Sequence, residues 1–384
     1  MRGLMIRLRG DRGSMAPLVA VLLTGGILFG AAAVVVDVGR IYGEREELQS
    51  SADAAALAAV TACAQGAGTR QCTPEALLAA AAPIAERNAS DGAVDLLPVC
   101  GRQRGAALVG QCRPVPENLS GCVGERPKEG NYFEVQASTR QRDGSRLLPP
   151  TFARALAGEP EGTTVAACSR VTWGAALGVP KAFKMMVSEC AWEELTGNGT
   201  LVAAKPTAFP WNPPGNEVVL RNEVAGCGGR DLGFFIGPQV VTCVDGVETG
   251  RDYIGFDLEN LLGVVGAGGI GALCGILASL QDFFAYIRDF ILGTSPELRV
   301  VYLPVYEDDP DPFLLLFQRY RVIGLAPFVI TGANLGLYRY PPLGQGPVPC
   351  TPNPCLKGHF VKDTIKGPFG LQDDYGLSSL KLAG

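Results

Sequence analysis

Apolar residues form one long uninterrupted block near the start of the chain. Residues 17–36 read PLVAVLLTGGILFGAAAVVV and carry no charge. At about 1.5 Å of rise per residue, a helix of this length measures about 30 Å, which is the thickness of a bilayer's hydrocarbon core. The pattern therefore predicts a transmembrane helix over residues 17–36.

The charges on the two sides of this block differ in sign. Residues 1–16 carry four arginines and one aspartate, whereas the residues directly after Val36 are net negative. By the positive-inside rule, residues 1–16 form a cytoplasmic tail and the rest of the chain lies on the other side of a single-pass span. A cleaved signal peptide with Ala31–Ala33 as its cleavage site is the alternative, and the length of the apolar run favours an uncleaved anchor.

A second helix pattern continues directly from the apolar block. Residues 37–65 are rich in Ala, Leu, Glu and Gln, which are good helix formers. Apolar residues recur there at spacings of three, four and seven, so they share one face of a stalk helix. That face contains Leu48, Ala52, Ala55, Ala56 and Ala59. Small side chains let another helix approach closely, so the face predicts either a seam for a partner helix or packing on the chain's own ectodomain.

Three motifs in this region together resemble the Tad module of TadE/TadG-like proteins, which belong to the assembly of Flp (tight adherence) pili. The motifs are Arg12-Gly13-Ser14, Val36-Asp37-Val38-Gly39-Arg40 and the run LQSSADAAALAA over residues 48–59. They place the module at residues 12–60. Weaker similarity to TadG-related ectodomains follows in LLPPTFARAL at residues 147–156 and in Asp374-Tyr375-Gly376.

This resemblance implies a non-enzymatic, membrane-anchored accessory protein in the assembly or anchoring of Flp/Tad-type (type IVb) pili. Such a protein is expected in a bacterial cell membrane, acting through its extracytoplasmic domain, with the lipid bilayer and TadE-like pseudopilins as partners. Two features of relatives are missing. Leu18 stands where a prepilin peptidase site has glutamate after Gly13, and the Asp-x-Ser-x-Ser string of a von Willebrand A metal site is absent.

All twelve cysteines follow residue 36, which is the distribution expected for an oxidising compartment. Sequence does not determine connectivity, but short loops suggest four candidate disulfides. They are Cys63–Cys72, Cys112–Cys122, Cys227–Cys243 and Cys350–Cys355. A zinc site built from Cys350, Cys355 and His359 is the alternative, and the lack of any C-x2-C pair argues against it. We therefore expect no metal.

Downstream of the stalk, the pattern predicts an α+β ectodomain that is rich in Gly, Pro and Cys, stabilised by disulfides and built on antiparallel strands. We divide it into a Cys-rich part over residues 66–175 and a second part over residues 176–384. A helix is expected at residues 73–88, with Thr73 as N-cap and Pro74 in the first turn. Strands are expected at the segments 133–137, 165–171, 299–306 and 320–330.

Residues 261–280 form another uncharged stretch of twenty residues, LLGVVGAGGIGALCGILASL. We favour a buried Gly-rich segment of the ectodomain, and a second membrane span is the main alternative. A third interpretation is a dinucleotide-binding turn, because Gly266, Gly268 and Gly271 have the G-x-G-x-x-G spacing that brings backbone close to a pyrophosphate. No second βαβ pattern follows, so we expect no cofactor.

Composition narrows the remaining function classes. A net charge of −5 argues against nucleic acid as a partner. His359 is the only histidine, so a Ser-His-Asp triad either uses it or is absent. The acidic run at residues 307–311 offers carboxylates for calcium, but it lacks the spacing of an EF-hand loop and fits a solvated turn better. We name no catalytic residue and keep an exported enzyme with an unidentified active site as the alternative.

Overall fold

The structure is a computed structural model of the 384-residue chain. It describes residues 15–24, 26–65, 72–103, 124–152, 162–206, 217–229, 231–238, 244–257, 300–314, 317–334 and 355–382, together with the short pieces 110, 112, 122, 339–340 and 350–351. Most of the tail 1–16, Cys243, and the segment 261–280, which includes Gly266, Gly268 and Gly271, lie outside the described residues.

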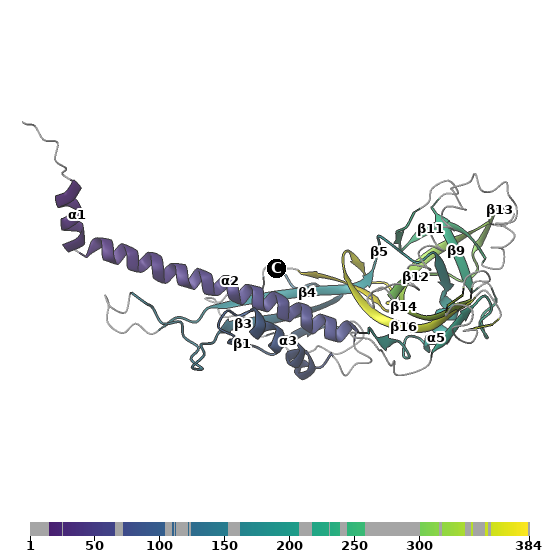
Figure 1. Ribbon diagram of the computed structural model, residues 1–384, viewed down its shortest axis with the longest axis horizontal. Coiled ribbons are helices and arrows are strands. Elements are labelled where there is room, and N and C mark those ends of the chain that lie inside the picture. Colours follow the sequence, from purple (N-terminus) through teal and green to yellow (C-terminus); the bar gives the residue numbers. More distant parts are fainter. Residues whose placement is uncertain are drawn as a thin grey trace, which may run out of the picture.

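Two consecutive helices form the start of the molecule (Figure 1). Helix α1 spans Met15–Thr24, and α2 spans Ile27–Gln65, which makes it 39 residues long. The prediction of one continuous helix over residues 17–36 is wrong, because the helix is interrupted at Gly26, between α1 and α2. This glycine has φ 71°, in the left-handed region that other residues avoid. Neither helix, nor any other in the described part of the chain, combines the length and hydropathy that crossing a bilayer requires.

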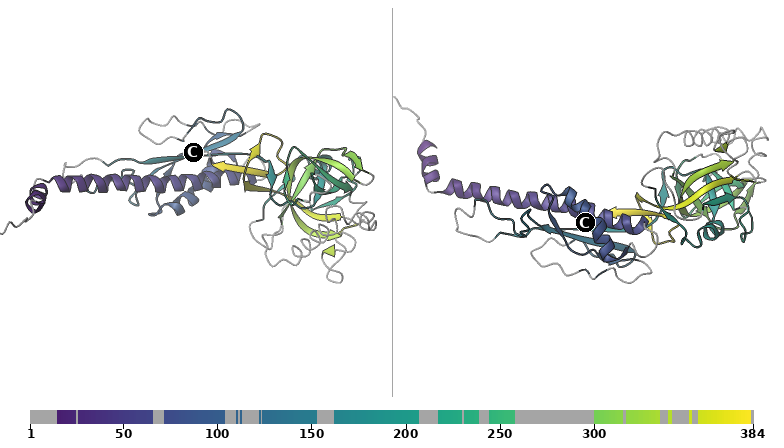
Figure 2. Two further views of the ribbon diagram at one scale, coloured as in Figure 1. Left: turned by 90° about the horizontal axis from the view of Figure 1, so that it is seen from above. Right: turned by 60° about the horizontal axis from the view of Figure 1, so that its bottom comes forward.

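A first module packs along the C-terminal half of α2. It contains α3 (Pro74–Asn88), which begins as predicted, with Thr73 Oγ1 accepting a hydrogen bond from Ala76 N at 3.3 Å. Its sheet contains β1 (Val94–Leu96), β2 (Cys100–Arg102), β3 (Asn131–Thr139), β4 (Ala166–Ala176), β17 (Phe369–Gly370) and β18 (Leu377–Leu382). The strands predicted at 133–137 and 165–171 are present as β3 and β4, which pair antiparallel in register from Asn131 opposite Trp173 to Ser138 opposite Ala166. Figure 2 shows α2 lying along this sheet.

A second module stands beyond the far end of α2. Among the described strands, five pair in a closed ring in the order β14–β11–β9–β6–β12–β14. They are β6 (Met185–Ser188), β9 (Leu232–Gly237), β11 (Arg251–Asp257), β12 (Val300–Tyr306) and β14 (Phe317–Asn334). Helix α5 (Glu189–Thr196) follows β6 directly. The strands predicted at 299–306 and 320–330 are present and pair antiparallel with each other.

One long strand joins the two modules. β16 (Cys355–Lys366) pairs with β14 through its first half and with β18 through its last four residues. The remaining short strands are β5 (Gly178–Val179), β7 (Ala203–Ala204), β8 (Val218–Arg221), β10 (Val247–Glu248), β13 (Asp311–Leu314) and β15 (Arg339–Tyr340). Apart from β5 and β10, which form a separate two-stranded sheet, the described strands of both modules belong to one continuous hydrogen-bonded network.

The expectation of antiparallel strands alone is wrong, because the sheet is mixed. β16 pairs in parallel with β18 and β7, and β12 pairs in parallel with β6. A parallel partner cannot follow through a tight hairpin, so such strands come from separated parts of the chain. Val187 in β6 lies beside Val305 in β12, for example. No local pattern in the sequence signals that pairing.

Each module has its own apolar core. The first core lies between α2, α3 and the sheet, with Phe133 against Trp173 at 4.6 Å between ring centroids. The second core joins residues of the ring strands to residues of α5, β8 and β16. In it Phe328 contacts Phe360 at 5.0 Å, and Phe234 stacks on Phe256 at 5.1 Å. Because the first core includes residues of α2, the ectodomain is fixed to the rod over the rod's C-terminal half.

Candidate functional site

The alanine face of α2 lies inside the chain. Leu48, Ala52, Ala55, Ala56 and Ala59 each expose 3 % of their surface or less. They belong to one cluster with residues of α3, β3 and β4. Small side chains allow α3 and the sheet to approach α2 closely, which is the second of the two interpretations given above. The seam for a partner helix is therefore wrong, because its residues are covered by the chain itself.

Enlarging one of these alanines tests this packing. We expect Ala56→Leu to lower the free energy of unfolding by about 1–3 kcal/mol, because added methyl groups in a filled core force neighbours apart. Ala58, on the same helix and only half-buried, gives the matched control, and Ala58→Leu is expected to cost less. Urea denaturation of the two variants compares them, and equal costs would contradict the burial described here.

Two charged residues of the Tad-like motif hold an arm of the ectodomain. This arm, residues 140–152, follows β3 and runs beside α2 towards α1 (Figure 1). Asp37 Oδ1 accepts hydrogen bonds from Thr151 N at 2.7 Å and Phe152 N at 3.2 Å. Arg40 Nη1 donates to Pro149 O at 3.2 Å and also to Thr151 Oγ1. Residues three apart share a helix face, so Asp37 and Arg40 clamp the same stretch of backbone.

Further polar residues of α2 continue these contacts along the rod. Glu47 accepts from Ser90 Oγ at 2.7 Å, just beyond the end of α3. Gln49 Nε2 donates to Asp53 Oδ1 at 2.9 Å and to Cys168 O at 3.1 Å. Burial against the first module raises the pKa of Glu44, and a hydrogen bond with Thr139 partly opposes this effect. The polar positions of the motif thus bind the rod to the ectodomain.

The clamp gives a prediction about the arm. We expect Asp37→Asn to weaken the hold on Thr151 and Phe152 by about 1 kcal/mol, because the hydrogen bonds lose their charged acceptor. Trypsin should then cleave at the arm's arginines about five-fold faster, since local opening controls such cleavage. Glu46→Gln removes an equal charge from an exposed position of the same helix and should leave the rate unchanged. Equal rates for both variants would show that Asp37 does not hold the arm.

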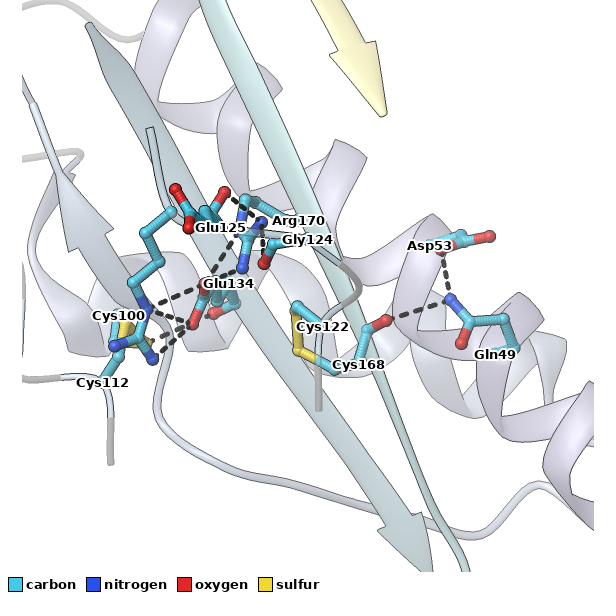
Figure 3. The surroundings of a disulfide bond; sticks show 11 residues. Gln49, Asp53, Cys100, Cys112, Cys122, Gly124, Glu125, Glu134, Cys168 and Arg170 are labelled. Carbon is cyan, nitrogen blue, oxygen red and sulfur yellow. Dashed lines mark hydrogen bonds and ion pairs between the residues drawn. A yellow bond between two sulfur atoms is a disulfide. The ribbon is translucent and has the colours of Figure 1, made fainter. Parts of the chain in front are cut away.

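A buried carboxylate with two arginines lies in the middle of the first sheet (Figure 3). Glu134 is 2 % exposed, and its Oε1 accepts from Arg170 Nε at 2.8 Å. Arg126 Nη2 donates to Glu134 Oε2 at 3.0 Å, and this bond raises the pKa of Arg126. Arg170 Nη1 also donates to the carbonyls of Gly124 and Glu125. This network ties the segment before β3 to the centre of the sheet.

The disulfides agree with two of the four pairs suggested by short loops. Cys63 is bonded to Cys72, and Cys350 is bonded to Cys355. The pair Cys112–Cys122 is wrong, because these residues bond instead to partners on the strands of the first sheet. The pair Cys227–Cys243 is also wrong, since Cys227 bonds to the start of α5. The observed bonds are Cys100–Cys112, Cys122–Cys168 and Cys190–Cys227. Folding, rather than loop length, brings these sulfurs together.

The disulfides also show which cysteines, among the described residues, have no thiolate to offer a metal ion. The zinc interpretation fails, because Cys350 and Cys355 are bonded to each other and offer no thiolate, while His359 lies within β16. Cys100, Cys112 and Glu134 come close together, but the two sulfurs form a disulfide and the carboxylate accepts from arginines. In the acidic run, Asp308 accepts a hydrogen bond from Cys190 N at 3.1 Å, and Glu307 pairs with Arg321 at 3.3 Å.

A hollow of about 770 Å³ lies beside the second module, lined by residues 177–180 and 246–249 and their neighbours. Its two charged side chains, Glu248 and Arg251, form an ion pair at 2.6 Å. Tyr253 Oη accepts from Glu248 N at 2.8 Å, and burial raises the pKa of this tyrosine. These polar groups are engaged with one another and do not form a nucleophile with a general base.

Several large apolar side chains in the N-terminal part of the rod are exposed to solvent. Val21, Val34 and Val35 expose 67 %, 63 % and 72 % of their surfaces, and Tyr42 exposes 63 %. Contiguous exposed apolar surface normally marks an interaction site with a membrane or another protein. The rod therefore has two parts: an apolar end without cover, and a C-terminal half buried in the first module.

Sequence reasoning missed the clamp and the Glu134 network. Asp37 and Arg40 appeared only as parts of a motif, although their i, i+3 spacing directly after an apolar block was a usable signal. Glu134 gave no comparable signal, because its partner Arg170 lies 36 residues away in the chain. Only the pairing of β3 with β4 brings the two residues together.

The fold thus defines a class of protein in which a long helix with an apolar end carries two sheet-rich modules stabilised by disulfides. A family model described as "Putative Flp pilus-assembly TadE/G-like" matches residues 13–65, which include both helices of the rod. The N-terminal segment of the chain is therefore similar to this family, and the resemblance seen in the sequence is confirmed. No curated protein and no solved structure matches the chain.

Proposed function

We propose that this protein is a non-enzymatic accessory component in the assembly or anchoring of Flp/Tad-type (type IVb) pili. In this proposal its apolar N-terminal end is held in a bacterial cell membrane, with the N-terminus on the cytoplasmic side and the ectodomain outside. The Tad match over residues 13–65 is the observation that carries the proposal. The uncovered valines of α1 and α2 support the anchoring part, because apolar surface of that extent is costly in water.

The covered half of α2 suggests how the protein would act. From Asp37 to Gln65 the helix rises about 42 Å at 1.5 Å per residue. Packing of α3 and the first sheet on this length makes it a stiff spacer. The second module is thereby carried at a fixed distance from the membrane, where it would guide or tether the emerging fibre. TadE-like pseudopilins are the proposed partners, and they must contact surfaces other than the buried alanine face.

Gene deletion with complementation tests this function. We expect loss of the gene to reduce both the number of surface pili and adherence, and the unmodified gene to restore them. An altered gene, in which a cleavable signal peptide replaces residues 1–36, exports the same ectodomain without its apolar end. If anchoring is required, this altered gene should not restore piliation or adherence. Unchanged piliation and adherence after deletion would remove the assembly role altogether.

A further inference from the structure

We propose that the arm formed by residues 140–152 is a second membrane contact, which lies in the headgroup zone of the bilayer that holds the apolar end of the rod. The proposal rests on the anchoring described under the proposed function. It adds a surface that the Tad segment does not include, because the arm belongs to the ectodomain. Its binding partner is a phospholipid surface, contacted by the exposed apolar side chains and the arginines of the arm.

The clamp fixes the position of the arm relative to the apolar end. Asp37 is the first charged residue after the apolar block, and it holds Thr151 and Phe152 directly. Just before the other end of the arm, Thr139, the last residue of β3, lies beside Glu44 of the rod and partly opposes the rise in the pKa of Glu44 that burial causes. Seven residues separate Asp37 from Glu44, which is about 10 Å of helix. The arm therefore covers the 10 Å of rod next to the apolar block, comparable to the headgroup zone of about 5–8 Å on each side of a bilayer.

Two apolar side chains of the arm are exposed to solvent. Phe152 is 48 % exposed and Leu147 is 42 % exposed, whereas Leu148 of the same arm is buried. On the rod at the same level, Val38 and Tyr42 are also exposed. Aromatic side chains beside the end of an apolar span are typical of the membrane–water interface. Exposed apolar groups thus occur on both the arm and the rod at the level where the bilayer surface is expected.

The charges of the arm fit a phosphate-bearing surface. It carries Arg140, Arg142 and Arg146 against Asp143 alone, in a chain whose net charge is −5. Arg146 bonds to Asp95 and Arg142 donates its Nε to Asp91 O, but each guanidinium has five donors, so these bonds leave donors for phosphate.

Tryptophan quenching by brominated lipids tests the proposal on the full-length protein in vesicles. Phe152→Trp places a reporter in the arm, beside the clamp. Leu201→Trp places one in the second module, where Leu201 is 54 % exposed and so similarly accessible. Contact with the membrane should shift the emission of the tryptophan at position 152 to shorter wavelength, and lipids brominated in the upper acyl chain should quench it. Neither effect is expected for the emission of the tryptophan at position 201. The unmodified protein supplies the background from its native tryptophans.

A third reporter separates this proposal from the anchoring itself. Val21→Trp lies within the apolar end and should be quenched by lipids brominated deeper in the chain. Quenching at position 21 with none at 152 would overturn the arm contact and leave the anchor standing, whereas quenching at neither site would overturn both. Quenching at 152 should increase when phosphatidylglycerol replaces part of the phosphatidylcholine, and equal quenching in both mixtures would refute the role of the arginines.

Discussion

Replacing Glu134 with alanine is expected to lower the free energy of unfolding by about 3–5 kcal/mol. The side chain of Arg170 is only 5 % exposed and pairs with Glu134 at 2.7 Å. Removing the carboxylate takes this counter-charge away from a buried guanidinium, and the cost of that loss exceeds the value of the ion pair. Urea denaturation followed by tryptophan fluorescence measures the change, with Trp173 in the adjacent strand as a local probe.

Two comparisons isolate the cause. Glu129→Ala removes an exposed carboxylate from the same region and should change stability by less than about 0.5 kcal/mol. The double variant Glu134→Leu with Arg170→Met replaces the pair by apolar side chains and should recover most of the loss, because no unpaired buried charge remains. Arg126 is 45 % exposed in its side chain and stays solvated in both variants. A double variant as unstable as Glu134→Ala would contradict this explanation.

Local patterns predicted the elements that carry their own signals. Thr73 and Pro74 marked the start of α3 because a cap and a first-turn proline satisfy the helix N-terminus locally. Phe133, Val135 and Ala137 alternate with polar neighbours, and this period placed β3. The segment from residue 175 to 260 gave little periodicity, although it contains several strands and α5. Those strands are mostly two to seven residues long, which is too short for a period to emerge.

Properties set by distant residues were beyond such patterns. The apolar block contains the pair Gly25-Gly26, a dipeptide that often marks a turn, but glycines are also common in membrane helices, so the sequence did not decide whether the helix is interrupted there. Cys168 was not linked to Cys122 because a loop of 46 residues closes only when β4 takes its place in the sheet. Loop-closure entropy rises slowly with length, so proximity in sequence is a weak guide to pairing.

The candidate site shows the same division. Periodicity identified the face of α2 that contains Ala52, Ala55 and Ala56, because helical geometry alone brings these residues together. It did not show what covers the face, since alanine packs equally well on a partner helix and on the chain's own sheet. That choice depends on α3 and β4, which are separate segments of the chain. The clamp at Asp37 and Arg40 likewise required the position of residues 149–152.

Removing the Cys122–Cys168 disulfide with paired alanine substitutions is expected to destabilise the first module by about 4 kcal/mol. The bond closes a loop of 46 residues, and the entropy that such a loop regains on unfolding gives this value. Because the bond also joins the segment before β3 to β4, its loss should expose the Glu134 network to solvent. Equilibrium denaturation of the oxidised protein measures the effect, with mass spectrometry to verify that the other disulfides remain intact.

The matched control is the pair Cys350–Cys355, which closes a loop of only five residues. The same relation gives about 2 kcal/mol for this bond, so its double alanine variant should lose roughly half as much stability. The order of the two costs is the decisive result, because side-chain truncation is the same in both variants. If removal of Cys350–Cys355 proved as costly as removal of Cys122–Cys168, strain or local packing rather than loop closure would determine how these bonds stabilise the ectodomain.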